Sequence, residues 1–261
     1  MYKHLFGVVF VVFGLLKSEQ HRNWDSHSAY TLKPQRWEVG LFQAFRYGYS
    51  ENLEFSTHPL WFFVLPNLAI KKPAKDLFGH KVASRFSGYY PTPLLNMLSR
   101  SGIGGLIDPN ITMPPMVAIS ASMICSQEAK GIDYSLKAGV DIGRAFGELD
   151  SRSNIDLPMV YHRLGIFYNG WGVHSGLDIQ REILKNIKIH MDFDLRLLPG
   201  FSSKNDDHSF RMLEGEKSLE HKFLIIMRMS ENVRVKTGYK FTLGEFPYGN
   251  DVRMLPYIPV I

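Results

Sequence analysis

The chain has 261 residues, of which 45% are hydrophobic and 13% aromatic, and its formal net charge is +5. This composition excludes a disordered chain. It does not indicate nucleic-acid binding either, because the basic residues alternate with apolar ones instead of clustering. The single cysteine, Cys125, excludes an intramolecular disulfide framework and a multi-cysteine metal site.

Residues 1–18 predict a secretory signal peptide. Lys3 and His4 precede an apolar run from Leu5 to Leu16, which is too short for a spanning helix and suits the apolar region of a signal. The sequence does not define the cleavage site, since Ser18 is the only small residue near the expected cut. We expect an exported chain with an extended segment at 19–36 and a single domain at 37–261.

Alternation of apolar and polar residues predicts β-strands from Trp37 to the C-terminus, because a period of two points side chains to opposite faces. In residues 187–197 apolar side chains alternate with Lys188, His190, Asp192, Asp194 and Arg196. The same pattern predicts about a dozen strands. The clear ones are 36–48, 133–143, 170–180, 186–200 and 232–246, and the weaker ones are 53–65, 68–72, 81–90, 116–127, 160–170, 219–229 and 252–258.

One insertion, residues 91–115, interrupts the strands. Its prolines at 91, 93, 109, 114 and 115 prevent long pairing in a ladder, and we expect a short helix from Pro93 to Arg100. We predict that this segment lies at the end of the sheet or folds inside it as a partial plug. A charged stretch at 199–217 predicts a long exposed loop.

A soluble β-sandwich also alternates, but three features favour a membrane. The alternating stretches are about ten residues or longer, as a tilted membrane crossing requires. Charges and glycines occupy the middle of the polar face. Aromatic residues lie towards strand ends, as in interfacial girdles, namely Trp37, Tyr47, Trp61, Tyr134, Trp171 and Tyr239. Because lipid tolerates no unpaired sheet edge, the prediction is an all-β, antiparallel transmembrane β-barrel of about twelve strands.

Two segments carry a resemblance to a known group. "RYGYSENLEFSTHPL" (46–60) and "MRMSENVRVKTGYKFTLGEF" (227–246) share a Ser-Glu-Asn turn that leads into an alternating strand. The chain thereby resembles bacterial outer-membrane β-barrel proteins, particularly small transport barrels. One departure is the ending "YIPVI", because such barrels usually finish on an aromatic residue that the assembly machinery reads. The resemblance implies an outer-membrane location in a Gram-negative cell, with contacts to membrane lipids and the barrel assembly machinery.

We expect the polar faces to line the lumen. The candidate lining residues are Glu54, Ser56, His58, Lys137, Asp141, Lys188, His190, Asp192, Asp194, Arg196, Arg234, Lys236 and Lys240. Glu54, Ser56 and His58 share one strand face, but Ser56 and His58 would be roughly 6–7 Å apart, too far for direct activation. The histidine spacing does not indicate a metal site. The sequence thus assigns no catalytic, cofactor or metal residue.

The predicted function is a porin-like passive pore or transporter for a small solute. The alternatives are a closed structural or adhesion barrel, and an outer-membrane lipid-modifying enzyme using Ser56 or His58. A secreted soluble β-sandwich is a further alternative. Because the lining charges mix signs, they predict no strong preference for anions or cations.

Overall fold

The computed structural model describes residues 13–16, 27–40, 43–59, 61–100, 108–149, 166–167, 170–198, 217–230, 233–246 and 249–260. Within these ranges the chain forms one α-helix, α1 (Thr92–Leu98), and thirteen strands in one antiparallel sheet. The strands are β1 (Phe13–Leu16), β2 (Trp37–Gly40), β3 (Gln43–Ser50), β4 (Leu53–Thr57), β5 (Asn67–Leu77), β6 (His80–Tyr89), β7 (Met116–Ala129), β8 (Ile132–Ala145), β9 (Trp171–Leu184), β10 (Ile187–Leu197), β11 (Lys217–Arg228), β12 (Val233–Phe246) and β13 (Gly249–Val260). The prediction of an all-β chain with a short helix in the insertion is confirmed.

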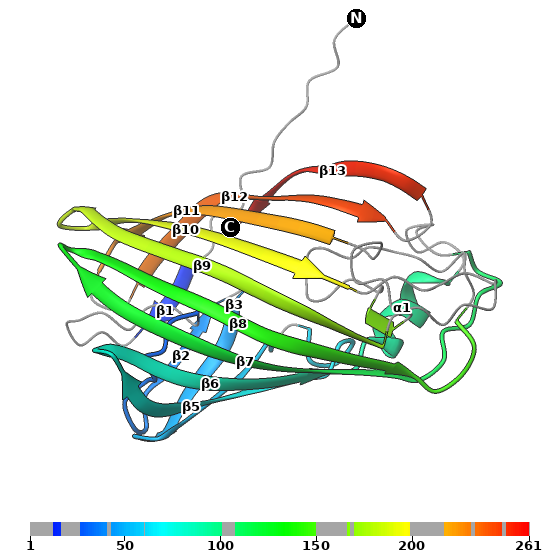
Figure 1. Ribbon diagram of the computed structural model, residues 1–261, viewed down its shortest axis with the longest axis horizontal. Coiled ribbons are helices and arrows are strands. Elements are labelled where there is room, and N and C mark those ends of the chain that lie inside the picture. The colour runs from blue at the N-terminus through cyan, green and yellow to red at the C-terminus, as the bar shows by residue number, and fades with distance from the viewer. Residues whose placement is uncertain are drawn as a thin grey trace, which may run out of the picture.

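The strands follow one another around the sheet in sequence order, from β1 to β13. The sheet curls, as Figure 1 shows, and β1 pairs with both β2 and β12. The β1 ladders join three residues to β12 and two to β2, whereas β7 and β8 pair over fourteen. Strand β1 is therefore held by far shorter ladders than the long strands β7 and β8.

The two ends of the sheet differ in their connections. At one end, on the left of Figure 1, tight turns such as Phe78–Gly79 and Lys130–Gly131 join the strands. Both residues of each turn have positive φ, between 48° and 81°, as type I′ hairpin turns require. At the other end the links from β6 to β7, β8 to β9 and β10 to β11 are long.

Three predicted strands have different bounds in the structure. Residues 36–48, predicted as one strand, form the hairpin of β2 and β3, with Trp37 opposite Tyr47. Next to the turn Gly40 stands opposite Gln43, and a β-bulge then shifts the register so that Glu38 stands opposite Arg46. Beyond the bulge, even-numbered residues of both strands share one face, so the alternation continues from one strand into the next and does not reveal the turn. The strand predicted at 53–65 ends at Thr57, and the one at 68–72 extends to Leu77.

Several other predictions lie wholly or partly outside the described residues. Of the predicted signal peptide, only Phe13–Leu16 is described, as strand β1. Most of the predicted strand at 160–170 and of the loop at 199–217 is also outside. The signal peptide therefore stays a prediction.

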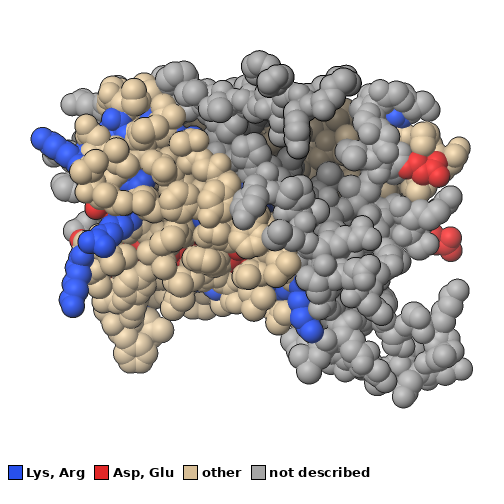
Figure 2. Space-filling model, turned by 90° about the horizontal axis from the view of Figure 1, so that it is seen from above, with Lys and Arg blue, Asp and Glu red and all other residues tan. Residues whose placement is uncertain are grey.

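The two faces of the sheet have opposite chemistry. We call the face that carries the buried charges of Glu54, Asp141 and Asp192 the inner face, and the opposite one the outer face. Large apolar side chains are exposed along the outer face, including Phe86, Val117, Ile119, Met123, Leu136, Val140, Ile142, Leu195, Leu219 and Leu243. In Figure 2 the described surface is mostly free of charge, and basic side chains project at the end with the tight turns. This polarity is the reverse of a soluble sheet.

An apolar cluster lies at the end with the long connections. It joins Leu94 and Leu95 of α1 to Tyr89 at the end of β6 and Met116 at the start of β7. Ile166, Phe167 and Leu198 also belong to it. Thr92 ties the segment to β7, because its hydroxyl donates to the Pro114 carbonyl and accepts from the Met116 amide. The described residues of the insertion, 91–100 and 108–115, therefore contribute to an apolar cap. No helix among the described residues is long and apolar enough to cross a membrane.

Candidate functional site

The inner face holds a chain of ion pairs, and Asp192 of β10 is at its centre. Lys137 of β8 lies 2.6 Å from Asp192 Oδ1, and Lys222 of β11 lies 3.1 Å from Oδ2. Lys137 also lies 2.8 Å from Asp194. The Asp192 side chain is only 3% exposed. Lysine ammonium groups therefore take the place of water as the partners of both carboxylate oxygens. Three strands are thus linked through one carboxylate.

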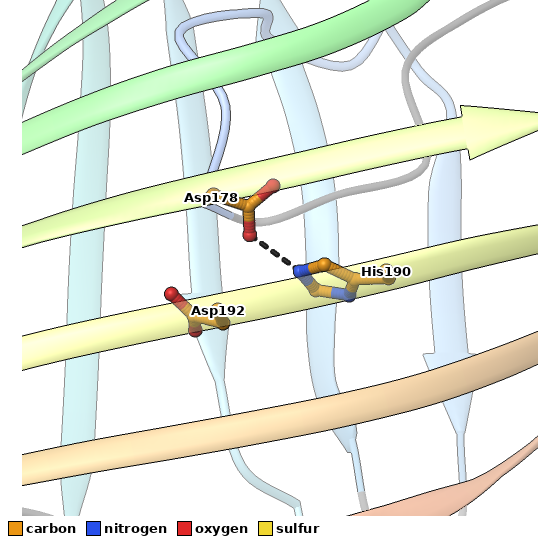
Figure 3. Close-up of side chains that lie close together, drawn as sticks. All are labelled: Asp178, His190 and Asp192. Carbon is orange, nitrogen blue, oxygen red and sulfur yellow. Dashed lines mark hydrogen bonds and ion pairs between the residues drawn. The ribbon is translucent and has the colours of Figure 1, made fainter.

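Beside this centre, His190 and Asp178 form a buried pair. His190 Nε2 lies 2.5 Å from Asp178 Oδ2, and Gln180 donates to the other Asp178 oxygen at 3.0 Å. Figure 3 shows Asp178 directed at the His190 ring, with Asp192 further along the same strand as His190. The ring is therefore oriented from β9, while its own strand supplies the neighbouring carboxylate.

Asp178, His190 and Asp192 could in principle bind a metal ion. Their ligand atoms all lie within 4.8 Å of one another, and carboxylate and imidazole groups are common ligands of divalent metals. However, both Asp192 oxygens already face the ammonium groups of Lys137 and Lys222. A cation would have to displace at least one lysine, so the cluster is better described as an internal ion network.

A second histidine pair lies nearer the apolar cap. His174 Nδ1 is 2.9 Å from Asp141 Oδ2, and Arg196 Nη1 is 4.0 Å from the same oxygen. A Cβ at Gly139 would lie 2.7 Å from the His174 ring, so this glycine makes room for the ring over β8. Asp141 is 2% exposed and fixes the ring from the neighbouring strand.

A third group joins the short strands. Arg46 of β3 donates to Glu38 at 3.1 Å and to both oxygens of Glu54 at 2.9 Å. Lys71 of β5 lies 3.4 Å from Glu54. The Arg46–Glu54 contact is bidentate, the strongest arrangement of such a pair, and it ties β3 to β4.

Among the predicted lining residues, Glu54, Lys137, Asp141, His190, Asp192, Asp194 and Arg196 take part in these three groups. Lys188 pairs with Asp133 at 3.4 Å, and Lys240 with Glu220 at 2.8 Å. Arg234 is buried and Lys236 half-buried on β12. Ser56 is half-buried beside Glu54, while His58 lies beyond the end of β4 against the Trp61 ring.

The sequence analysis missed several residues of these groups as candidates. They are Lys71, Asp133, Asp178, Gln180, Glu220 and Lys222. The same alternation could have found most of them. Asp178 follows His174 at an even spacing on β9, and Lys222 stands opposite Asp192 on β11.

No protein-family model, curated protein or solved structure matches this chain. The resemblance to outer-membrane barrels therefore rests on the residues and their pattern, and function has to be argued from the geometry.

Proposed function

We propose that the protein is a transmembrane β-barrel of an outer membrane that passes small solutes through its lumen. The observation that carries the proposal is the reversed polarity of the sheet. Asp192 is buried at 3% exposure, whereas its neighbour Phe193 is 36% exposed and Ile119 on β7 is 54% exposed. A sheet with a charged interior and an apolar exterior is stable in lipid, where the outer side chains leave water.

Strand length and connections support the same proposal. Strands β7, β8, β9 and β12 each have 14 residues, more than the roughly 9–11 that a tilted strand needs to cross the hydrocarbon layer. Tight turns at one end and three long connections at the other resemble outer-membrane barrels, in which the short turns face the periplasm. We therefore place the apolar cap on the outside of the cell.

The interior favours a narrow, weakly selective path. A barrel of about twelve strands lies between one of roughly eight, which side chains fill, and one of about sixteen, which leaves an aqueous channel. Carboxylates such as Asp192 and Glu220 balance ammonium groups such as Lys137 and Lys240. We infer that permeating solutes are small and that charge selectivity is slight.

Conductance and gel mobility together test the proposal. Purified protein should migrate differently on a detergent gel before and after boiling, and should give small, steady currents in a planar bilayer. Unchanged migration would contradict the membrane barrel. A heat-dependent shift without any current, under all voltages tested, would contradict the conduit alone.

The second candidate function is a closed barrel that serves as an anchor or adhesion surface. It is favoured by the spread of ion pairs along the inner face, from Lys188 and Asp133 near the tight turns to Lys240 and Glu220 nearer the cap. Such a barrel would shift on the gel and bind through its long connections, but it would not conduct.

A further inference from the structure

Residues 27–36, which we call the N-terminal segment, lie against the inner face of the sheet just before β2. Ser28, Ala29 and Leu32 are 7%, 4% and 2% exposed, so residues 28–32 are buried or half-buried although they belong to no strand, whereas residues 33–35 are exposed. Ala29 packs on Ala83 of β6 and Ile124 of β7. We call the inner face of the sheet around this segment the wall. Because the buried residues are not paired in a sheet, side chains of the wall have to satisfy their backbone polar groups.

The wall binds the backbone of this segment from several strands. The Ala29 amide donates to Ser126 Oγ of β7 at 2.8 Å, and the Leu32 amide donates to Glu54 Oε2 of β4 at 2.8 Å. Lys71 Nζ of β5 donates to the carbonyls of Ser28 and Tyr30 at 3.2 and 2.6 Å. The segment is therefore held from β4, β5 and β7.

The segment leaves the interior over Gly48 of β3. The Gln35 amide donates to the Gly48 carbonyl at 2.7 Å, and the Gly48 amide donates to the Arg36 carbonyl at 2.8 Å. A Cβ at Gly48 would lie only 2.2 Å from the Lys33 carbonyl oxygen. Only glycine permits this approach, so the wall is shaped to the backbone of the segment.

These contacts lie towards the tight-turn end, since Ser126 and Gly48 are near the last residues of β7 and β3. The apolar cap occupies the opposite end. We propose that the N-terminal segment is an internal plug that narrows the lumen at the tight-turn end, so that larger currents flow when it leaves its place. Residues 28–32 are held by side chains, which can rotate away, and the backbone bonds to β3 begin only at Gln35 and Arg36, where the segment leaves the interior. This inference rests on the proposed function, because a plug matters only in a lumen that conducts.

The contacts also define what the vacated wall would bind. Lys71 offers a donor to carbonyl groups, while Glu54 and Ser126 offer acceptors to amides. The chemistry fits an extended peptide backbone, and the N-terminal segment itself is the ligand that occupies the wall.

Planar-bilayer recordings on the full chain test the plug. Replacing both Ala29 and Leu32 with proline removes the two amide donors and leaves the wall intact. We expect a several-fold higher mean conductance. Gly48→Val should also raise the conductance, because the new side chain on β3 would push the segment away. Pro34→Ala, at an exposed position of the segment, is the matched control and should conduct like the unaltered protein.

A disulfide cross-link between the N-terminal segment and β7 tests the plug by holding it in place instead of releasing it. In a Cys125→Ser background, Ala29→Cys combined with Ser126→Cys should hold the plug in place when oxidised and release it when reduced, with current rising on reduction. A synthetic peptide of residues 27–36 should block the proline variant, whereas a scrambled peptide should not. Equal currents in all variants that still shift on the gel would overturn the plug alone. No current from any inserted variant would overturn the conduit as well.

Discussion

Lys137 and Asp192 form an ion pair of 2.6 Å across an intervening strand. Lys137 is on β8 and Asp192 on β10, and β9 between them presents Gly176, whose missing side chain leaves the path open. A Cβ there would lie 2.2 Å from Asp194 Oδ1 and 2.7 Å from Lys137 Cε. The ion network therefore depends on a glycine that makes none of its charged contacts.

Removing the Lys137 ammonium should destabilise the fold strongly. Lys137→Met leaves the buried Asp192 carboxylate with fewer partners, and loss of one partner of a buried pair costs about 3–5 kcal/mol. Lys222 remains near Asp192, so the lower end is expected. Lys81→Met is the control, because Lys81 pairs with Asp76 at 2.6 Å on an exposed hairpin. Urea unfolding in detergent should show a loss for the first variant and little change for the second.

Gly176→Ala should destabilise by about 1–3 kcal/mol, as overpacking of a filled interior does. The new methyl group would press on the Phe193 carbonyl oxygen at 2.8 Å as well as on Asp194 and Lys137, and backbone cannot rotate away. At Gly88 the nearest atom would be 3.6 Å distant, so Gly88→Ala is the control. Equal midpoints of thermal unfolding for both variants would contradict the packing described here.

An arginine introduced on the outer face tests whether that face contacts lipid or water. Ile119 and Leu77 are similarly exposed, at 54% and 50%, but Leu77 ends the hairpin of β5 and β6. If β7 crosses a bilayer, Ile119→Arg should destabilise the fold by up to about 2–4 kcal/mol according to its depth, while Leu77→Arg should cost much less. Reversible unfolding in lipid vesicles measures both. In a soluble sheet the two changes would be equally mild.

The exported protein should lack residues 1–18. The mature chain would then also lack Phe13–Leu16, the short strand β1, and the sheet would run from β2 to β13. N-terminal sequencing of protein taken from a membrane fraction checks this. A chain that retains Phe13 would refute the signal peptide and would leave β1 in its place between β2 and β12.

The strands could be predicted from the sequence because alternation is a local signal. It located most strands and the short helix, but not the turn between β2 and β3, across which the alternation persists. The partners of each charge could not be predicted. That Lys137 meets Asp192 depends on register across three strands and on Gly176, and neither is visible in a single stretch.

The burial of the N-terminal segment could not be predicted from the sequence either. Residues 27–36 have no alternation, and the sequence indicated only an extended stretch. Their burial follows from Ser126, Lys71 and Glu54, which lie on three different strands and point to the same side. Such convergence arises only once the sheet has curled.

The most direct test of the membrane-spanning sheet is the solvent that touches its outer face. In a Cys125→Ser background, a nitroxide at Leu136→Cys should collide more with oxygen, which concentrates in lipid, than with a water-soluble nickel chelate. Leu136 is 56% exposed and is the fifth residue of β8. A nitroxide at Lys81→Cys, in the exposed hairpin, should show the opposite preference. Greater accessibility of position 136 to the nickel chelate, in protein reconstituted into vesicles, would contradict the account.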